Sequence, residues 1–199
     1  MATTGYAAFV MAMDRVEKRL RQVTAALDQA DIPYAVVGGN AVAAWVAQVD
    51  PAATRATKDV DLLVRRDDES RIAEVMQGLG FVRQGLRRFI LYIDPEEPSR
   101  RSGIHLVWAE VLIRPSYTCP SPSVTEVVRE PEGFALIDLP ALVRMKLTSF
   151  RDIDRVHIAD LLRVNLIDQG IRESLPNELA ERLSQVLSSL DEEDDDLMD

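Results

Sequence analysis

Cysteine and long apolar runs are almost absent from this chain of 199 residues. Cys119 is the only cysteine, which excludes an intramolecular disulfide and favours a cytoplasmic protein over a secreted disulfide scaffold. No apolar stretch approaches the roughly 18 to 20 residues that span a bilayer. The N-terminus has no basic segment followed by an apolar one, so we expect neither a secretory signal nor a membrane partner.

Acidic residues outnumber basic ones, and most of the excess lies in the last nine residues of the sequence. Asp and Glu total 33 against 23 Lys and Arg, which gives a net charge of −10. Residues 191–199 hold seven of these acids and no base, so the rest of the chain carries only −3. We expect this self-repelling segment to be a disordered acidic tail. The near balance elsewhere disfavours a strongly basic nucleic-acid-binding domain but is compatible with a local basic patch.

Hydrophobic residues follow two different periods along the chain. From Phe9 to Leu27 they recur every three or four residues, which predicts one amphipathic helix. Short apolar or alternating runs predict a helix at 70–79 and strands at 34–37, 59–64, 89–93, 104–108 and 134–137. From Asp138, a predicted N-cap, the pattern is helical to Phe150, at 154–166 and at 177–190. We therefore expect an α/β (α+β) core at 1–137, a helical C-terminal region packed on it at 138–190, and the acidic tail.

Two aspartates lie two positions apart in the apolar run at 59–64. A strand's period of two places Asp59 and Asp61 on one face, with Cα atoms roughly 6.5 to 7 Å apart. Two carboxylates held this way repel each other unless a cation lies between them. Hard oxygen ligands on a rigid strand suit Mg²⁺, which takes its other ligands from water and substrate phosphates. Without further context, such a pair more often marks a solvated strand end.

A glycine turn precedes the two aspartates. Residues 36–40, Val-Val-Gly-Gly-Asn, combine a strand end, Gly38 and Gly39, and a helix start that Asn40 can cap. Glycine lets backbone N–H groups approach a phosphate, and a helix N-terminus adds partial positive charge. By themselves, the glycines are better explained by a tight turn with positive φ. Together with the carboxylate pair, they predict a site for a nucleoside triphosphate bound through its metal.

The segments Val-Gly-Gly-Asn-Ala at 37–41 and Arg-Ala-Thr-Lys-Asp-Val-Asp-Leu at 55–62 resemble the nucleotidyltransferase fold of the polymerase-beta superfamily. Within it, the chain is most similar to small bacterial AbiEii toxin-like nucleotidyltransferases, and the likeness extends over 142–147 and 150–154. The resemblance implies a twisted mixed sheet flanked by helices and metal-dependent transfer of a nucleoside monophosphate. It also implies the roles of the site residues: triphosphate contacts for Gly38 and Gly39, and metal ligands for Asp59 and Asp61.

Catalytic members of this superfamily usually carry a third carboxylate on a neighbouring strand. The predicted strand at 104–108 offers His105 instead. Glu110 is the nearest acid, but it points to the opposite face of a regular strand unless a β-bulge turns it. Because imidazole titrates near working pH, His105 is the candidate for removing the acceptor proton. A polar residue on a strand face is the plainer interpretation.

Lys146 lies on the apolar stripe of its predicted helix, with Leu139, Leu142 and Val143. An unpaired buried ammonium is costly, so we expect an anionic partner, either a triphosphate or a carboxylate on the following helix such as Asp160. The resemblance favours the triphosphate, and a lysine reaching solvent along a helix edge is the alternative. Lys146 therefore joins the candidate nucleotide contacts, which from the motif segments also include Asn40, Thr57 and Lys58.

These features predict a metal-dependent nucleotidyltransferase that uses Mg²⁺ or Mn²⁺ and a nucleoside triphosphate such as ATP. The acceptor is expected to be an RNA, a protein or a small molecule, and the AbiEii-like resemblance implies a toxin–antitoxin system with an antitoxin partner. A catalytically impaired nucleotide-binding module that acts through a protein partner is the alternative. A third acid near the Asp59–Asp61 face favours the enzyme, and its absence favours the module. In a third, structural interpretation, the two aspartates only cap a strand end.

Overall fold

A seven-stranded sheet forms the centre of the chain, in the order β3-β4-β5-β2-β1-β7-β6. The structure, a computed structural model, describes residues 5–85, 90–96, 98–99, 102–129 and 133–196, except the side chains of residues 5–12 and 193–196. The strands are β1 (Tyr34–Val37), β2 (Val60–Val64), β3 (Val82–Gly85), β4 (Ile90–Ile93), β5 (Ile104–Trp108), β6 (Val127–Arg129) and β7 (Ala135–Ile137).

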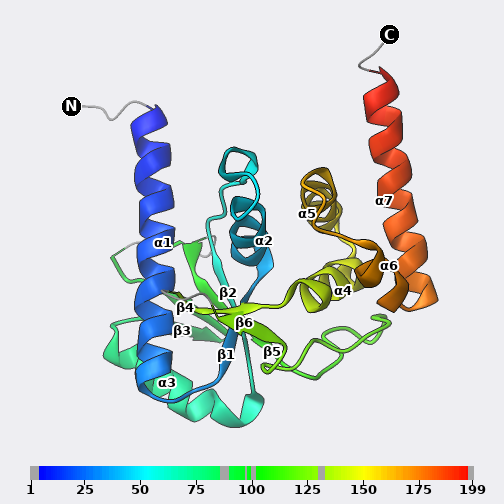
Figure 1. The fold of residues 1–199 in the computed structure, drawn as a ribbon. Helices are drawn as coiled ribbons and strands as arrows, with labels where there is room; N and C mark the ends of the chain where they lie inside the picture. The colour runs from blue at the N-terminus through cyan, green and yellow to red at the C-terminus, as the bar shows by residue number, and fades with distance from the viewer. Residues whose placement is uncertain (1–4, 86–89, 97, 100–101, 130–132, 197–199) are drawn as a thin grey trace.

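Helices flank this sheet. They are α1 (Gly5–Gln29), α2 (Gly38–Ala47), α3 (Glu69–Gly78), α4 (Leu139–Ser149), α5 (Asp152–Arg163), α6 (Gln169–Ser174) and α7 (Asn177–Asp196), with short 3₁₀ turns η1 (Pro51–Ala53) and η2 (Arg66–Asp68). In Figure 1, α1 lies to the left of the sheet, α3 lies below it, and α4 to α7 lie to the right. None of the described helices combines the length and apolar character needed to cross a membrane.

Both strand directions occur in the sheet. β1 pairs antiparallel with β2 and parallel with β7, while β2 pairs parallel with β5. β4 pairs antiparallel with both β3 and β5, and β6 pairs antiparallel with β7. The predicted fold class, a mixed sheet flanked by helices, is therefore confirmed.

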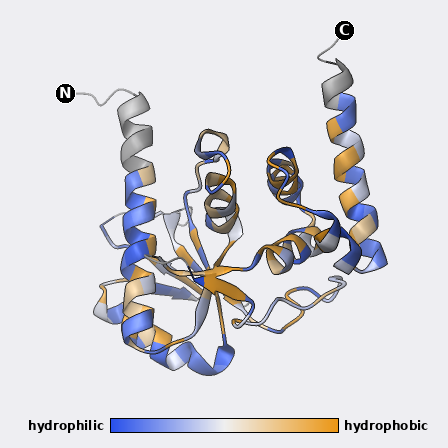
Figure 2. Cartoon of the chain, in the orientation of Figure 1, coloured by the Kyte–Doolittle hydropathy of each residue, from blue (hydrophilic) through white to orange (hydrophobic). Residues whose placement is uncertain are grey.

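The middle strands form the core because they are apolar on both faces. Every residue of β1 is buried, and β2 is buried except at Asp61. Figure 2 shows hydrophobic colour concentrated on the strands at the centre of the molecule. Helix α1 packs against α3 and β2, and its buried stripe consists of Val16, Leu20, Val23 and Leu27. The predicted amphipathic helix is confirmed for these residues, whereas the side chain of Phe9 lies outside the described part.

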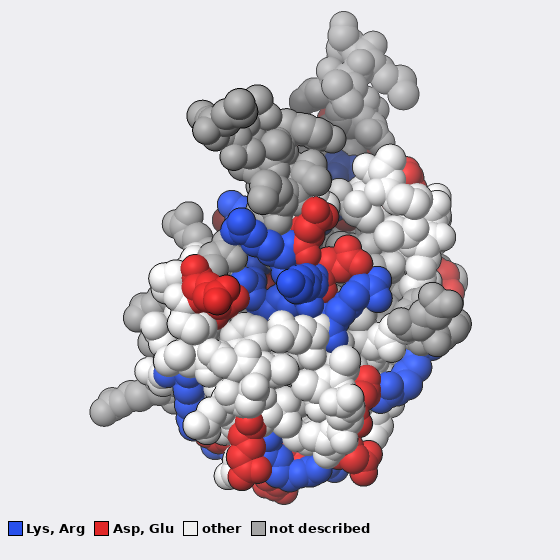
Figure 3. Space-filling model, turned by 90° about the vertical axis from the view of Figure 1, so that its left-hand side faces the viewer, with Lys and Arg blue, Asp and Glu red and all other residues white. Residues whose placement is uncertain are grey.

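The outer face of α1 carries charges of both signs. Arg15, Lys18 and Arg21 are exposed there, together with Asp14 and Glu17. Arg21 Nε donates to Glu17 Oε1 at 2.9 Å, one helical turn away. In Figure 3, Lys and Arg gather near the middle of this face of the molecule with Asp and Glu beside them. Such exposed pairs contribute little to stability, so they chiefly keep this face solvated.

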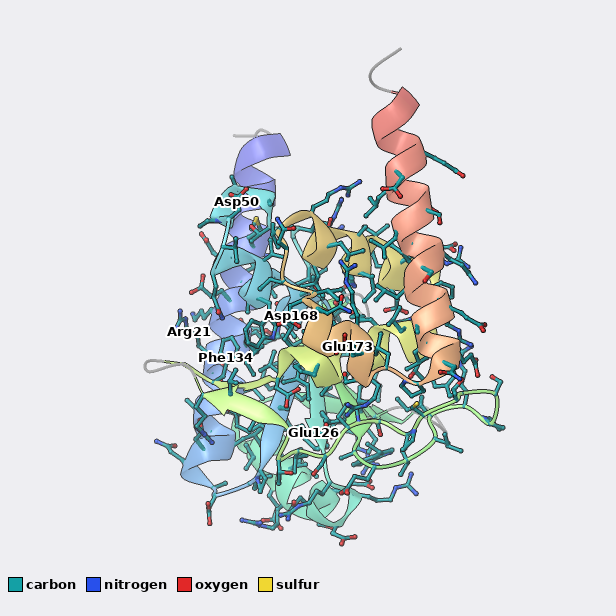
Figure 4. All side chains as sticks on the ribbon, turned by 45° about the vertical axis from the view of Figure 1, so that its right-hand side comes forward. Arg21, Asp50, Glu126, Phe134, Asp168 and Glu173 are labelled. Atoms are coloured by element: carbon teal, nitrogen blue, oxygen red, sulfur yellow. The ribbon has the colours of Figure 1, made fainter. Side chains whose placement is uncertain are left out.

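Three elements were not predicted from the sequence. β3 and β6 are the edge strands, and most of their residues are exposed, so neither shows the alternation of a half-buried strand. The third unpredicted element is the short α6, which begins where Asp168 accepts a hydrogen bond from the Ile171 N–H at 2.8 Å. The strand predicted at 89–93 is β4, which begins at Ile90, and Phe89 lies outside the described residues. The start of α6 can be followed in Figure 4, which labels Asp168 and Glu173.

The predicted N-cap role of Asn40 is wrong. Helix α2 begins at Gly38, and its N-cap is Val37, three residues before Asn40. Gly38 has a φ of +71°, which lets the chain turn from β1 directly into the helix. Asn40 consequently lies in the first helical turn, where its Nδ2 donates to the backbone oxygen of Asp59 at 2.6 Å. The side chain ties α2 to the residue that precedes β2.

The C-terminal helices pack onto the core through α2. As predicted, Asp138 caps α4, and its carboxylate accepts a hydrogen bond from the Ala141 N–H at 2.8 Å. Phe150 ends α4 in the left-handed region, at a φ of 44°, and the chain then enters α5. Both α4 and α5 contact α2, and α7 contacts α4 and α5. The helices after residue 138 therefore lie beside the ends of β1 and β2.

The predicted disordered tail is wrong for residues 191–196. Helix α7 continues through these acidic residues to Asp196, and residues 197–199 lie outside the described part. Figure 1 shows the last turns of α7 projecting beyond the rest of the chain. Leu179, Leu183 and Val186 are buried and anchor the first half of this helix. Once a helix is nucleated, each added residue costs little, so the anchored half extends into the acidic segment.

Replacing Leu183 tests whether α7 is part of the folded core. Leu183→Ala is expected to lower the free energy of unfolding by about 2 to 5 kcal/mol, because a buried leucine leaves a cavity. Ser188→Ala, at an exposed position of the same helix, is expected to change it by less than about 0.5 kcal/mol. Urea denaturation of both variants measures this. Equal stability of the two variants would show that α7 is not docked.

Candidate functional site

The hydrogen-bond register of the neighbouring strands β1, β2 and β5 places Asp61 and His105 side by side. Asp61 of β2 lies opposite Val37 of β1, the last residue before the glycine turn. On the other side, Asp61 lies opposite His105 of β5 in parallel register. Side chains opposite each other in a sheet share a face. The glycine turn, Asp61 and His105 are therefore adjacent although they are far apart in the sequence.

The carboxylates of Asp59 and Asp61 converge on His105. His105 Nδ1 lies 3.2 Å from Asp61 Oδ1 and 3.6 Å from Asp59 Oδ2. Ligand atoms of all three residues lie within 4.8 Å of one another. Thr57 Oγ1 donates to Asp59 Oδ1 at 3.0 Å and orients that carboxylate. Two acids and one imidazole thus face a common point.

Gly38 allows this convergence. A Cβ at Gly38 would lie 1.9 Å from Asp61 Oδ2, and the φ of +71° is one that other residues rarely adopt. A Cβ at Gly39 would lie 3.0 Å from Thr57 Oγ1. Two interpretations of the sequence therefore apply to Gly38. It forms a tight turn with positive φ, and its backbone lies close to a residue of the candidate site. The missing side chain provides the room that the Asp61 carboxylate occupies.

A cleft of about 590 Å³ opens above this cluster. Its walls come from the start of α2, the segment before β2, the loop after β5, and helices α4 and α5. Nearly all of the candidate site residues line it: Gly38, Gly39, Thr57, Lys58, Asp59, Asp61, His105 and Lys146. Asn40 is the exception, because its side chain is turned toward the backbone of Asp59. The fold therefore brings together most of the residues singled out from the sequence.

Lys146 is buried and pairs with a carboxylate of the following helix, as one expectation had it, but this carboxylate is Asp154 and not Asp160. Its Nζ donates to Asp154 Oδ1 at 3.2 Å, whereas Asp160 pairs with Arg55 at 2.6 Å. Only 5% of Lys146 and none of Asp154 is exposed. Asp154 also accepts hydrogen bonds from Ser149 Oγ and Arg151 Nε, both at 2.7 Å. Asp154 reaches Lys146 because it lies in the first turn of α5, which begins at Asp152, close to the end of α4.

Burial and the ion pair act in opposite directions on these two groups. Burial lowers the pKa of Lys146, and the charge of Asp154 only partly offsets this effect. Burial acts to raise the pKa of Asp154, but the hydrogen bond from Arg151 and the charge of Lys146 outweigh it and lower the pKa to about 2. Asp154 is therefore ionised at neutral pH and balances the buried ammonium next to the cleft.

His157 of α5 also lines the cleft, although it was not among the candidate site residues. Its Nδ1 is buried without a hydrogen-bond partner among the described residues. A buried acceptor without a partner is less costly than a buried N–H, so the ring proton belongs on Nε2. Burial lowers the pKa of His157 to about 4, which keeps the ring neutral. A Cβ at Gly39 would lie 3.8 Å from His157 Cε1, so the ring adjoins the glycine turn.

The loop after β5 adds residues that no sequence pattern indicated. Arg114, Tyr117 and Cys119 line the cleft, and the Arg114 guanidinium lies 5.8 Å from the centre of the Tyr117 ring. The prolines at 115, 120 and 122 indicate only an irregular connection. A loop has no periodic signal, so its approach to the cleft becomes visible only in the fold.

Among the described residues, no third carboxylate joins Asp59 and Asp61 in their cluster with His105. Glu110 is exposed and adopts a φ of 58°, and it does not join Asp59 and Asp61. His105 occupies the neighbouring-strand position instead. The hydrogen bond with Asp61 raises the pKa of His105, burial opposes this, and the charges of both aspartates add to the rise. Its Nδ1 faces the carboxylates, so this nitrogen is not open to an acceptor hydroxyl.

The donor set fits a divalent cation. Two carboxylates and an imidazole on rigid elements can supply three ligands and leave other positions for water and phosphate oxygens. The spacing of their ligand atoms, within 4.8 Å, allows one ion to reach all three. Asp59 and Asp61 are the residues that would hold it.

Comparison with known protein families agrees with this geometry. A family model described as uncharacterised nucleotidyltransferase matches residues 3–121, more than half of the chain. The chain belongs to this family. The match includes the glycine turn, both aspartates and His105, whereas Lys146, Asp154 and His157 lie beyond it. It does not distinguish the AbiEii toxin-like branch, which stays a prediction.

Two solved structures are similar to this nucleotidyltransferase to different degrees. An antigenic nucleotidyltransferase-like protein from Paracoccidioides brasiliensis is 19% identical, with 93% of this chain and 91% of that chain covered and a TM-score of 0.52. The antibiotic-resistance factor ANT(2'')-Ia is 17% identical, with 89% and 84% covered and a TM-score of 0.47. At this identity, the first likeness shows the fold alone. None of the curated proteins matches the chain.

Gly38→Ala tests the close approach of the turn to Asp61. The new Cβ overlaps the Asp61 carboxylate, and the left-handed backbone adds a cost of about 1 to 2 kcal/mol. We expect Mn²⁺ affinity to fall at least tenfold, measured by isothermal titration calorimetry. Gly78→Ala, in open space on α3, is the control and is expected to leave Mn²⁺ affinity unchanged. Unchanged affinity in Gly38→Ala would contradict this packing.

The low pKa of Asp154 predicts a specific pH dependence of stability. Because the pKa is depressed in the folded chain, the stabilisation is present above about pH 4 and is lost as the pH falls toward 2. Urea denaturation is expected to show that protonation of Asp154 lowers the free energy of unfolding by about 2 kcal/mol across that pH range. Asp154→Asn is expected to remove this loss and to lower stability at pH 7 by about 3 kcal/mol or more. Asp152→Asn, at an exposed neighbouring position, is expected to keep the wild-type profile.

Proposed function

We propose that this protein transfers a nucleoside monophosphate from a nucleoside triphosphate to an acceptor hydroxyl, with a divalent cation at Asp59 and Asp61. The observation that carries the proposal is the convergence of these carboxylates beside the N-terminus of α2, inside a cleft. Membership of the nucleotidyltransferase family supports it. A cation bound there would neutralise charge on the triphosphate during transfer.

The N-terminus of α2 is the phosphate-binding element of this proposal. Gly38 and Gly39 begin the helix without side chains, so their N–H groups are open to phosphate oxygens, and the helix dipole favours the negative charge. Lys58 is exposed at the rim and adds a mobile positive charge. Thr57 acts through Asp59, to which it donates a hydrogen bond. Asn40 acts as a brace, not as a direct contact.

Lys146 has a second role beside its ion pair. Its Nζ is held by Asp154 at the cleft wall, so the ammonium is positioned before a ligand arrives. The negative charge of a triphosphate beside the Lys146 ammonium would compensate for the water that this buried group has lost. Arg151 lines the same wall and pairs with the same carboxylate. Two cations therefore share one anion, and the net positive charge that remains suits a triphosphate.

The transfer reaction needs an in-line arrangement of acceptor and leaving group. The acceptor oxygen forms a bond to the α-phosphorus, the bond from that phosphorus to the bridging oxygen breaks, and pyrophosphate leaves with the electron pair. The acceptor releases its hydroxyl proton in the same process. The residues of this chain contribute chiefly by holding the phosphates and excluding water, which accounts for much of phosphoryl-transfer catalysis.

The acceptor that we propose is a macromolecule, either RNA or protein. The support is the AbiEii-like resemblance of the motif segments, which also predicts an antitoxin partner. Exposed Lys58, Arg114 and Arg151 line the rim of the cleft and suit an acceptor with negative charge.

One observation favours a second candidate function. The neighbouring-strand position holds His105 where a catalytic member usually has an acid, which fits a nucleotide-binding module without turnover. Such a module keeps the cation and triphosphate sites and acts through a protein partner. A transfer assay separates the two functions.

The transfer assay uses each labelled nucleoside triphosphate with total cellular RNA and protein, in the presence of Mg²⁺ or Mn²⁺. Wild type is expected to label an acceptor, and Asp61→Asn is expected to reduce labelling about a hundredfold or more because one cation ligand is lost. Asp67→Asn, at an exposed acid outside the cleft, is expected to behave as wild type. Nucleotide binding without labelling in wild type would support the module. Labelling that persists in Asp61→Asn would refute the proposed chemistry.

A further inference from the structure

His105 is placed as a ligand and not only as a neighbour of the two aspartates. It lies directly opposite Asp61 in the parallel pairing of β2 and β5. The same nitrogen, Nδ1, is directed at both carboxylates, at 3.2 Å from Asp61 and 3.6 Å from Asp59. About a quarter of each side chain is exposed for His105 and Asp61, at 27% and 25%, so the cluster opens to the cleft.

These separations match those of ligands around one small cation. In an octahedral site with bonds of about 2.1 Å, neighbouring ligand atoms lie about 3 Å apart and opposite ones about 4.2 Å apart. Both Nδ1 to oxygen distances are close to the value for neighbouring ligands. His105 Nδ1 can therefore neighbour an oxygen of either aspartate in a single coordination sphere. The other positions of that sphere remain available for water and triphosphate oxygens.

The donor chemistry of this cluster differs from that of three carboxylates. Carboxylate and water oxygens suit Mg²⁺, whereas imidazole nitrogen suits first-row transition metals. Exchanging one carboxylate for a neutral imidazole also removes one negative charge, which weakens a site that binds a hard cation by charge. Both effects act against Mg²⁺.

We propose that His105 is the third protein ligand of the cation site and that the site therefore prefers a divalent transition metal, such as Mn²⁺, over Mg²⁺. This inference rests on the proposed function only in assuming that a cation occupies the site. It assigns His105 to the cation through Nδ1, so the ring is not the base that removes the acceptor proton.

The direct test is the electron spin echo spectrum of Mn²⁺ bound to the full chain. Coordination by an imidazole nitrogen produces modulation from ¹⁴N, which water and carboxylate ligands do not. Wild type is expected to show this modulation, and His105→Asp is expected to lose it. Cys119→Ser, which changes a cleft residue outside the cation site, is expected to keep it. Bound Mn²⁺ without ¹⁴N modulation in wild type would overturn the inference while leaving the proposed function intact.

Selectivity gives a second readout that does not depend on activity. The dissociation constant for Mn²⁺ is measured from the free ion signal, and that for Mg²⁺ by competition, for wild type and for His105→Asp. The ratio of Mg²⁺ to Mn²⁺ dissociation constants is expected to fall at least tenfold in His105→Asp, because the variant restores a third carboxylate. An unchanged ratio would contradict the inference. If wild type binds neither ion, with or without a triphosphate, both the inference and the proposed function fail. Because the spin echo test needs only wild type, a misfolded variant does not leave the question open.

Discussion

The hydrogen-bond register of β1, β2 and β5 determines the geometry of the whole site. It places Asp61 between Val37, the residue before the glycine turn, and His105 on the next strand. A shift of one residue in any of these pairings would turn Asp61 or His105 to the other face of the sheet. The register is secured because the flanking residues of all three strands are buried and apolar. The core therefore stabilises the fold and aims the polar groups at the same time.

A second constraint joins the C-terminal helices to this sheet. Asp154 is fully buried and receives hydrogen bonds from Lys146, Ser149 and Arg151, so the start of α5 is held against α4. Asp160 adds a link from α5 to Arg55, four residues before Asp59. The segment that carries Thr57 and Asp59 is thus held by α5 on one side and by Asn40 of α2 on the other. The cleft depends on the helical region as much as on the sheet.

The sequence allowed prediction of those parts of the site that depend on local pattern. The strand at 34–37, the turn at Gly38, the shared face of Asp59 and Asp61, and the cap at Asp138 follow from periodicity and backbone chemistry. Asn40 was misassigned because positive φ at Gly38 moved the helix start. The partner of Lys146 was misassigned because helix periodicity gives the face of a residue but not how two helices cross. His157, Arg114 and Tyr117 reach the cleft only through tertiary packing, so no local signal could show their role.

We propose that one divalent cation and a triphosphate meet at Asp59, Asp61 and the first turn of α2. A crystal structure with Mn²⁺ and a non-hydrolysable nucleoside triphosphate, with the metal located by anomalous scattering, tests this arrangement. We expect one anomalous peak bonded to both carboxylates and to His105 Nδ1, with the phosphates against the N–H groups of Gly38 and Gly39. A metal peak away from these carboxylates, or a triphosphate bound outside this cleft, would contradict it.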